Sequence, residues 1–177
     1  IEFAGNDAQF PGPPTGPTPE DDNLMGTPEN DVIDLLSGDD TYDGFAGDDT
    51  ITAGTGADLV NGGEGNDWIF GIDGDNTLHG DAGNDIIFGG GGDESITGGT
   101  GNDVLLGGEN QDTLEGGDGH DTIDGEHGND VIEGNGGDDW LKGEGGHDLI
   151  LGGTGRDQME GGSGNDTMDG EAGHDTL

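Results

Sequence analysis

Aspartate recurs at a fixed interval of nine residues through most of this chain, and it is the residue type best suited to chemistry here. Counting from Gly26, the interval defines seventeen repeats, and the sixth position of fifteen of them is Asp. Carboxylates held in register are ligands for a hard cation, since calcium takes six to eight oxygens from carboxylates and backbone carbonyls. The spacing therefore predicts a row of cation sites.

The ligand types favour calcium over other metals. Magnesium prefers a stricter octahedron and retains water, so a carboxylate- and carbonyl-rich turn suits it less well. Zinc prefers Cys and His, but the chain has no Cys and its five His are scattered.

Catalytic motifs are missing from the sequence. It contains no His-Glu-x-x-His run, nucleophile elbow or phosphate loop. His120, His147 and His174 all occupy position five, where we expect solvated turn side chains. We therefore predict that this segment is not an enzyme. This prediction does not extend to a catalytic domain outside the segment.

The charge balance excludes several classes of protein. The 177 residues include 42 acidic and two basic ones, for a net charge of −40, and only 25% are hydrophobic. No nucleic acid partner is expected, because phosphate binding needs a basic surface. No apolar stretch is long enough for a membrane-spanning helix. Such a composition is typical of disorder unless something cancels the charge.

The other repeat positions indicate how the carboxylates are placed. Positions one and four are each Gly in fifteen repeats, and position eight is always large and nonpolar or aromatic. Three residues around position eight suit a short strand, and the six Gly- and Asp-rich residues suit a tight turn. Two repeats then make one coil, with odd-numbered repeats stacked in one sheet and even-numbered repeats in the other. We predict an all-β fold, a right-handed parallel β-roll of about 17 half-turns.

The clearest copy of the repeat is Gly62-Gly63-Glu64-Gly65-Asn66-Asp67-Trp68-Ile69-Phe70. It resembles the RTX, or hemolysin-type calcium-binding, nonapeptide repeat, a motif whose fold is already known. The resemblance covers residues 26–177 and implies calcium bound in the turns by position-six carboxylates and Gly carbonyls. The implied carboxylate ligands are Asp31, Asp40, Asp49, Asp58, Asp67, Asp85, Asp103, Asp112, Asp121, Asp130, Asp139, Asp148, Asp157, Asp166 and Asp175. The implied carbonyl ligands belong to Gly38, Gly47, Gly56, Gly65, Gly83, Gly101, Gly119, Gly128, Gly137, Gly146, Gly155 and Gly164.

The resemblance also implies a function. Up to about fifteen Ca²⁺ ions, at two charges each, would cancel most of the charge of the repeats. Family members are typically secreted by one-step bacterial export and fold on calcium outside the cell, as modules of enzymes or toxins. The alternative is a structural segment of an extracellular adhesin or surface-layer protein.

The chain divides into two unlike parts. Residues 1–25 hold five of the six prolines and are interpreted as a Pro-rich acidic linker and the tail of an upstream region. Residues 26–177 are the predicted β-roll, and the chain stops inside a repeat at Leu177. We therefore expect the functional domain of the parent protein to lie outside these residues.

Departures from the repeat fall on one side. All five breaks at positions one, four and six beyond the first repeat lie in even-numbered repeats, which predicts weaker or missing calcium sites along the even side of the N-terminal half. The alternative is sequence drift without consequence. The breaks are Leu35, Ala53, Asn76, Glu94 and Asn110.

Positions seven and nine should point away from the core, and in three repeats they are large and apolar. These repeats are the fifth, seventh and ninth, so the six residues should form one exposed patch bounded by Thr50, Thr52, Thr122 and Asp124. Such patches usually mark contacts, so another domain or a second copy is expected to dock there. Strand-former preference without contact is the alternative. The patch residues are Trp68, Phe70, Ile86, Phe88, Val104 and Leu106.

Overall fold

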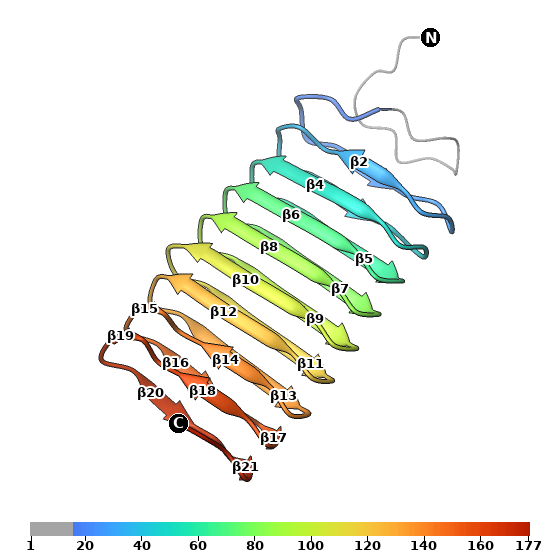
Figure 1. Ribbon diagram of the computed structural model, residues 1–177. Helices are drawn as coiled ribbons and strands as arrows, with labels where there is room; N and C mark the ends of the chain where they lie inside the picture. The colour runs from blue at the N-terminus through green and yellow to red at the C-terminus, as the bar shows by residue number, and fades with distance from the viewer. Residues whose placement is uncertain (1–15) are drawn as a thin grey trace.

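The computed structural model describes residues 16–177 as a stack of flattened coils with one β-sheet on each broad face (Figure 1). Every strand pairing is parallel, as expected when successive coils lay equivalent strands beside each other. Residues 16–177 contain no helix, and hence none that could cross a membrane. The predicted two-sheet parallel β-roll is confirmed.

Two sheets share the strands. The ten-stranded sheet holds β2 (Val32–Asp34), β4 (Thr50–Thr55), β6 (Trp68–Asp73), β8 (Ile86–Gly91), β10 (Val104–Glu109), β12 (Thr122–His127), β14 (Trp140–Lys142), β15 (Gly145–Gly146), β18 (Gln158–Glu160) and β19 (Ser163–Gly164). The eleven-stranded sheet holds β1 (Asn23–Met25), β3 (Thr41–Asp43), β5 (Leu59–Glu64), β7 (Thr77–Ala82), β9 (Ser95–Thr100), β11 (Thr113–Asp118), β13 (Val131–Gly136), β16 (Leu149–Leu151), β17 (Thr154–Gly155), β20 (Thr167–Asp169) and β21 (Ala172–Gly173).

The strand register confirms that two nonapeptides make one coil. Ile69 of β6 lies opposite Ile87 of β8, which in turn lies opposite Leu105 of β10. Each step is two repeats long, so residues at the same repeat position stack along each sheet. This stacking brings the position-six residues of every second repeat into one column.

The strands are longer than the sequence suggested. From β4 to β13 each has six residues and runs from position seven through position three of the next repeat, where three residues were predicted. Position two within these strands has a left-handed backbone, as at Gly63 with φ of 110° and Ile72 with φ of 87°. The ladder continues through it because the stacked neighbours share the same conformation, and the sharp turn is confined to positions four to six.

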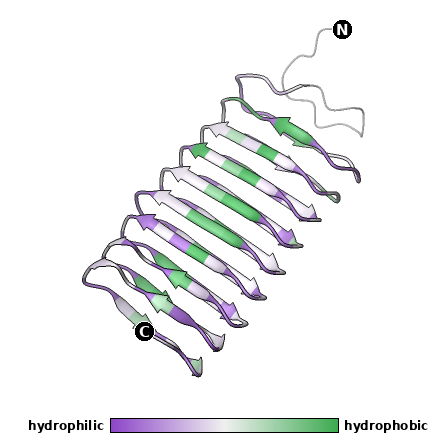
Figure 2. Ribbon diagram, in the orientation of Figure 1, coloured by the Kyte–Doolittle hydropathy of each residue, from purple (hydrophilic) through white to green (hydrophobic). Residues whose placement is uncertain are grey.

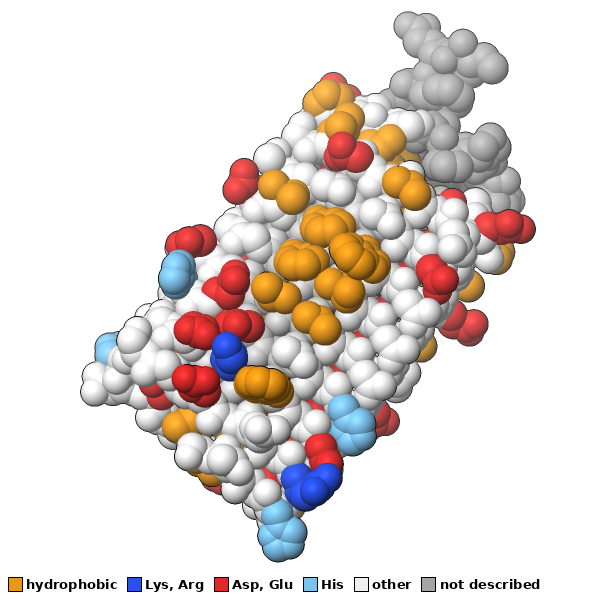
Figure 3. All heavy atoms as spheres, in the orientation of Figure 1, with side chains coloured by type: hydrophobic (Ala, Val, Ile, Leu, Met, Phe, Trp, Pro, Cys, Tyr) orange, Lys and Arg blue, Asp and Glu red, His pale blue; other side chains and the backbone are white. Residues whose placement is uncertain are grey.

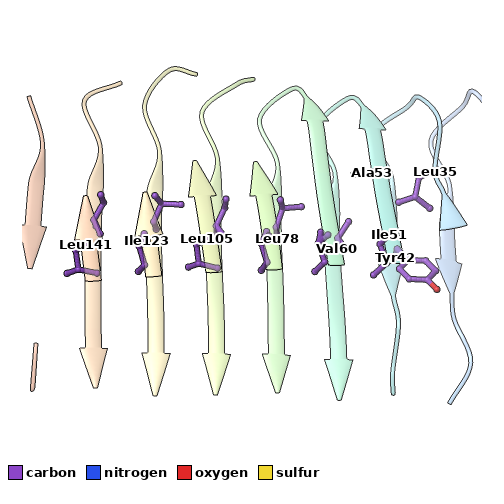
Figure 4. Close-up of a cluster of buried hydrophobic side chains, with 14 of the residues drawn as sticks. Leu35, Tyr42, Ile51, Ala53, Val60, Leu78, Leu105, Ile123 and Leu141 are labelled. Carbon is purple, nitrogen blue, oxygen red and sulfur yellow. The ribbon is translucent and has the colours of Figure 1, made fainter. Parts of the chain in front are cut away.

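The core lies between the sheets and consists mainly of position-eight side chains from both of them (Figure 4). Apolar residues accordingly stripe the middle of the strands, and polar residues gather at the turns (Figure 2). Position one also faces inward, since Leu35 and Ala53 are completely buried. Leu35 and Ala53, which are breaks in the repeat, therefore add side-chain volume to the core where glycine would add none. Leu177, the last position-eight residue of the sequence, is 63% exposed.

The ladder begins before the predicted boundary at residue 26. Strand β1 pairs with β3, and Leu24 is buried as a further position-eight residue. Asp22 then occupies position six of an additional turn that starts at Pro17. Pro17 at position one and Glu20 at position four replace the usual glycines there and conceal the pattern. The linker prediction for residues 1–15 lies outside the described residues.

Candidate cation sites in the turns

The position-six side chains form two columns, one along each edge of the roll. We call the turns of odd-numbered repeats, from Asp31 to Asp175, the odd edge, and those of even-numbered repeats, from Asp22 to Asp166, the even edge. Most of these side chains are buried, including Asp67 and Asp85 at 0% exposure. The backbone turn at positions four to six directs these side chains into the interior of the roll.

One carboxylate oxygen of each aspartate ties two coils together. The backbone N–H of Asp49 donates to Oδ1 of Asp67 at 2.8 Å, and the N–H of Asp67 donates to Oδ1 of Asp85 at 2.8 Å. On the odd edge this series runs unbroken from Asp31 to Asp175. The carboxylate is therefore part of the backbone ladder as well as a candidate ligand.

The second carboxylate oxygen, Oδ2, is buried without a hydrogen-bond partner. Twelve aspartates share this feature, and both carboxylate oxygens of Glu94 are also unpartnered. An unpartnered buried charge is too costly to keep without a counter-ion. The twelve are Asp40, Asp49, Asp58, Asp67, Asp85, Asp103, Asp112, Asp121, Asp130, Asp139, Asp148 and Asp157.

The basic side chains of the protein do not supply the missing charge. The chain has only two of them. Lys142 pairs with Glu144 at 3.1 Å, and Arg156 pairs with Asp138 at 2.6 Å, both on the surface. The buried carboxylates must therefore be neutralised by protons or by an ion from solution.

Burial and repulsion raise the pKa values of the column. Desolvation on burial is the largest cause of the rise in pKa. A backbone hydrogen bond to each carboxylate opposes it, and the charges of neighbouring carboxylates raise the pKa further. The pKa rises to about 7 for Asp85 and Asp130, and to about 6 for Asp49 and Asp121. Without a cation, the ionised form of these groups is less favourable in the folded state than it is in water.

The glycines leave room for oxygen atoms. A side chain at position one, for example at Gly62, would collide with Oδ2 of Asp67 and lie 3.0 Å from the Gly80 carbonyl. A side chain at position four, for example at Gly65, would overlap the Gly47 carbonyl of the preceding coil. Each turn thus gathers a carboxylate and carbonyl oxygens around glycine, which is the donor set that calcium prefers.

Side chains alone do not complete a site. No group of three or more His, Cys, Asp or Glu with metal-ligand spacing occurs within residues 16–177. Apart from the Asn76 turn, each turn contributes one position-six carboxylate, so backbone carbonyls must supply most of the other ligands. The position-six Asp and position-four Gly residues singled out in the sequence share these turns, and their role as ligands remains a prediction.

The first turns differ from the rest. Oδ2 of Asp31 accepts the backbone N–H of Thr27 at 2.6 Å, and Oδ2 of Asp22 accepts that of Thr18 at 2.7 Å. Both turns begin Thr-Pro-Glu, and the Thr hydroxyl contacts the same carboxylate. Asp31 was predicted to resemble the other ligands, but a protein N–H already occupies its second oxygen. The duplicated Thr-Pro-Glu run is the signal that could have revealed this.

Position five forms a second, outer column that the sequence reasoning missed. On the odd edge, Asn84 N–H donates to Oδ1 of Asn66 at 2.9 Å, and His120 N–H donates to Oδ1 of Asn102 at 2.8 Å. Nδ1 of His120 accepts from the next coil in turn. Its imidazole is therefore a hydrogen-bond acceptor in the ladder as well as a solvated turn side chain. The frequent Asn and Asp at position five were the available signal.

A two-sheet parallel solenoid with a buried acidic column along each edge is a cation-binding repeat protein. The sequence model of the RTX calcium-binding nonapeptide repeat matches the chain in five segments, residues 18–44, 43–72, 70–105, 106–141 and 142–177. The chain belongs to this family. Its match begins at residue 18, in agreement with the additional turn at Asp22. None of the curated proteins compared with the chain matches it.

Proposed function

We propose that the roll binds calcium in its turns and folds as it does so, as the stabilising module of a larger secreted bacterial protein. The observation that supports this is the buried, unpartnered Oδ2 of twelve position-six aspartates. Calcium is a divalent ion that accepts carboxylate and carbonyl oxygens in flexible geometry, so it can neutralise such a column. Since an unfolded chain offers no preformed site, binding free energy becomes folding free energy.

Circular dichroism tests the calcium requirement directly. In EDTA we expect the spectrum of a disordered chain, and in millimolar calcium that of β-structure. Magnesium at the same concentration is the control, and we expect it to restore less β-structure because it retains water and requires a stricter octahedron. A spectrum that is the same in EDTA and in calcium would contradict the proposal.

The secreted setting rests on the family. Calcium is scarce inside cells and millimolar outside, so a module that needs it would fold only after export. The parent protein is then an enzyme or toxin, with the adhesin or surface-layer segment as the alternative. The regions that flank this chain in its parent protein discriminate between them: a catalytic domain supports the first, and tandem adhesion domains support the second.

A contact surface on the ten-stranded sheet is a second proposal. Trp68 and Phe70 of β6 lie opposite Ile86 and Phe88 of β8, and the Phe70 and Phe88 rings stack at 5.1 Å. Val104 and Leu106 of β10 complete the cluster, visible as the apolar group at the centre of Figure 3. Such a patch on an acidic surface favours docking of a domain or a second copy.

The double variant Trp68→Asp with Phe88→Asp tests the contact surface. Sedimentation of the calcium-bound wild type is expected to show self-association, and in the parent protein the patch is expected to hold a neighbouring domain. The variant should lose that association while keeping its β-structure. Unchanged assembly and unchanged domain association would contradict the proposal.

A further inference from the structure

The turn at Asn76 is the place where a neutral side chain replaces the position-six carboxylate. Asn76 is 1% exposed and keeps the ladder on one side, because its Oδ1 accepts the N–H of Asp58 at 3.0 Å. Its Nδ2 donates to the carbonyl of Gly74 in the same turn at 3.0 Å. The amide nitrogen therefore lies where the other turns place the unpartnered Oδ2, beside the position-one glycine.

This hydrogen bond shows what the aspartate turns lack. At Asn76 the position-six side chain faces the position-four carbonyl, and in an aspartate turn the two corresponding groups are both acceptors. A bound cation would satisfy such acceptors, whereas at Asn76 an N–H of the protein satisfies the Gly74 carbonyl.

Reorientation of the amide would not create a site. Turning Oδ1 toward Gly74 would break the Nδ2 hydrogen bond and leave two oxygens facing each other. It would also bring the NH₂ group against the N–H of Asp58, donor against donor. The hydrogen bonds on both sides hold the amide in the orientation that excludes an ion.

The next turn on the even edge completes the interruption. At Glu94 the longer side chain places Cγ beside Gly89 and moves Oε1 toward Gly92. Both carboxylate oxygens of Glu94 lack a well-aligned hydrogen bond, although the Asn76 N–H lies near enough to stabilise the carboxylate. The ladder resumes only with the Glu94 N–H, which donates to Oδ1 of Asp112 at 2.9 Å.

We propose that the Asn76 turn binds no calcium and that its amide acts as a built-in substitute for the ion. The even edge then consists of two separate runs of turns, Asp22–Asp58 and Glu94–Asp166, whereas the odd edge is one run. This inference rests on the proposed calcium binding and specifies which turn of this chain departs from it.

Calcium stoichiometry tests the inference without reference to any activity. Calcium bound per chain is counted by equilibrium dialysis with metal analysis for the wild type, for Asn76→Asp and for the matched odd-edge control Asp85→Asn. We expect Asn76→Asp to bind one more ion than the wild type, and Asp85→Asn to bind one fewer. Dichroism in calcium checks that each variant folds.

The outcomes separate the inference from the proposed function. If Asp85→Asn loses an ion while folded Asn76→Asp gains none, the inference is wrong and calcium binding stands. If none of the three chains binds calcium, the proposed function itself fails. Anomalous scattering from a calcium-grown crystal of the wild type needs no variant: an ion between Asn76 and Gly74 would overturn the inference, and an amide hydrogen bond there with ions in the flanking turns would support it.

Discussion

Nδ1 of His120 accepts a hydrogen bond from the backbone N–H of Asp138 in the next coil, at 2.7 Å. The ring must be unprotonated at Nδ1 to do this. His147 accepts the N–H of Asn165 in the same way at 2.9 Å on the even edge. Histidine thus takes the role that asparagine plays elsewhere in the position-five columns.

The variant His120→Asn should preserve this link, because Asn102 already accepts the N–H of His120 itself. His120→Ala removes the acceptor and is expected to cost about 0.5–1.5 kcal/mol of folding free energy, as for other single hydrogen bonds. Thermal unfolding in saturating calcium measures both. Equal melting temperatures for the Asn and Ala variants would show that the link contributes nothing.

The glycine requirement should differ sharply between two nearby positions. At Gly83, φ is 144° and a Cβ would overlap the Gly65 carbonyl, so Gly83→Ala is expected to cost more than about 1 kcal/mol. At Gly91 a Cβ would meet nothing closer than 3.5 Å, so Gly91→Ala is the matched control and should be nearly neutral. Melting temperatures in calcium provide the comparison, and similar losses for both variants would contradict the turn geometry described above.

The core should be most sensitive at position eight. Ile123 is completely buried between the sheets, and Ile123→Ala is expected to cost about 2–5 kcal/mol through lost packing and a cavity. Thr122, its neighbour in β12, points outward, and Thr122→Ala should change stability by less than about 0.5 kcal/mol. Calcium titrations followed by dichroism would show the first variant folding only at higher calcium. A reversed order of the two would contradict the assigned faces of the strand.

The pH response should change sign with calcium. The pKa of Asp85 and Asp130 is about 7 in the metal-free fold, against an ordinary value of 3.8. Because the folded pKa is the higher one, this contribution to stability is fully present below about pH 4 and is lost as pH rises through about 7. Metal-free chain should therefore gain β-structure on acidification. The calcium-bound roll should lose it, because protons compete for the ligands.

Parallel dichroism titrations between about pH 7 and pH 4, one in EDTA and one in calcium, measure the two responses. Opposite slopes are the expected result. Slopes of the same sign would show that the carboxylate columns do not control the stability of the fold.

The nine-residue period was enough to predict the coils, the two sheets and the inward side chains at position eight. It could not show that position one also faces the core, because glycine there has no side chain to reveal alternation. Leu35 and Ala53 therefore looked like defects, whereas both are buried in the core. The strand length was underestimated for the same reason.

The candidate site was only partly readable from sequence. Asp at position six marked the carboxylate column. It could not show that Oδ1 accepts a backbone N–H from the neighbouring coil while Oδ2 stays unpartnered. Asn76 and Asp31 show why this matters, since a hydrogen bond inside the turn replaces an unpartnered oxygen in each. Such contacts depend on the side-chain orientation at one turn, and a pattern shared by all repeats does not specify that orientation.

Each position-six carboxylate joins its own turn to the coil before it, so the turns of one edge behave as a linear array with nearest-neighbour coupling. In such an array the steepness of the response to calcium grows with the number of linked turns. The odd edge links nine carboxylates without interruption, from Asp31 to Asp175. On the even edge the well-aligned hydrogen bonds stop at Asn76 and resume at Glu94, so the two edges of one molecule should respond to calcium with different cooperativity.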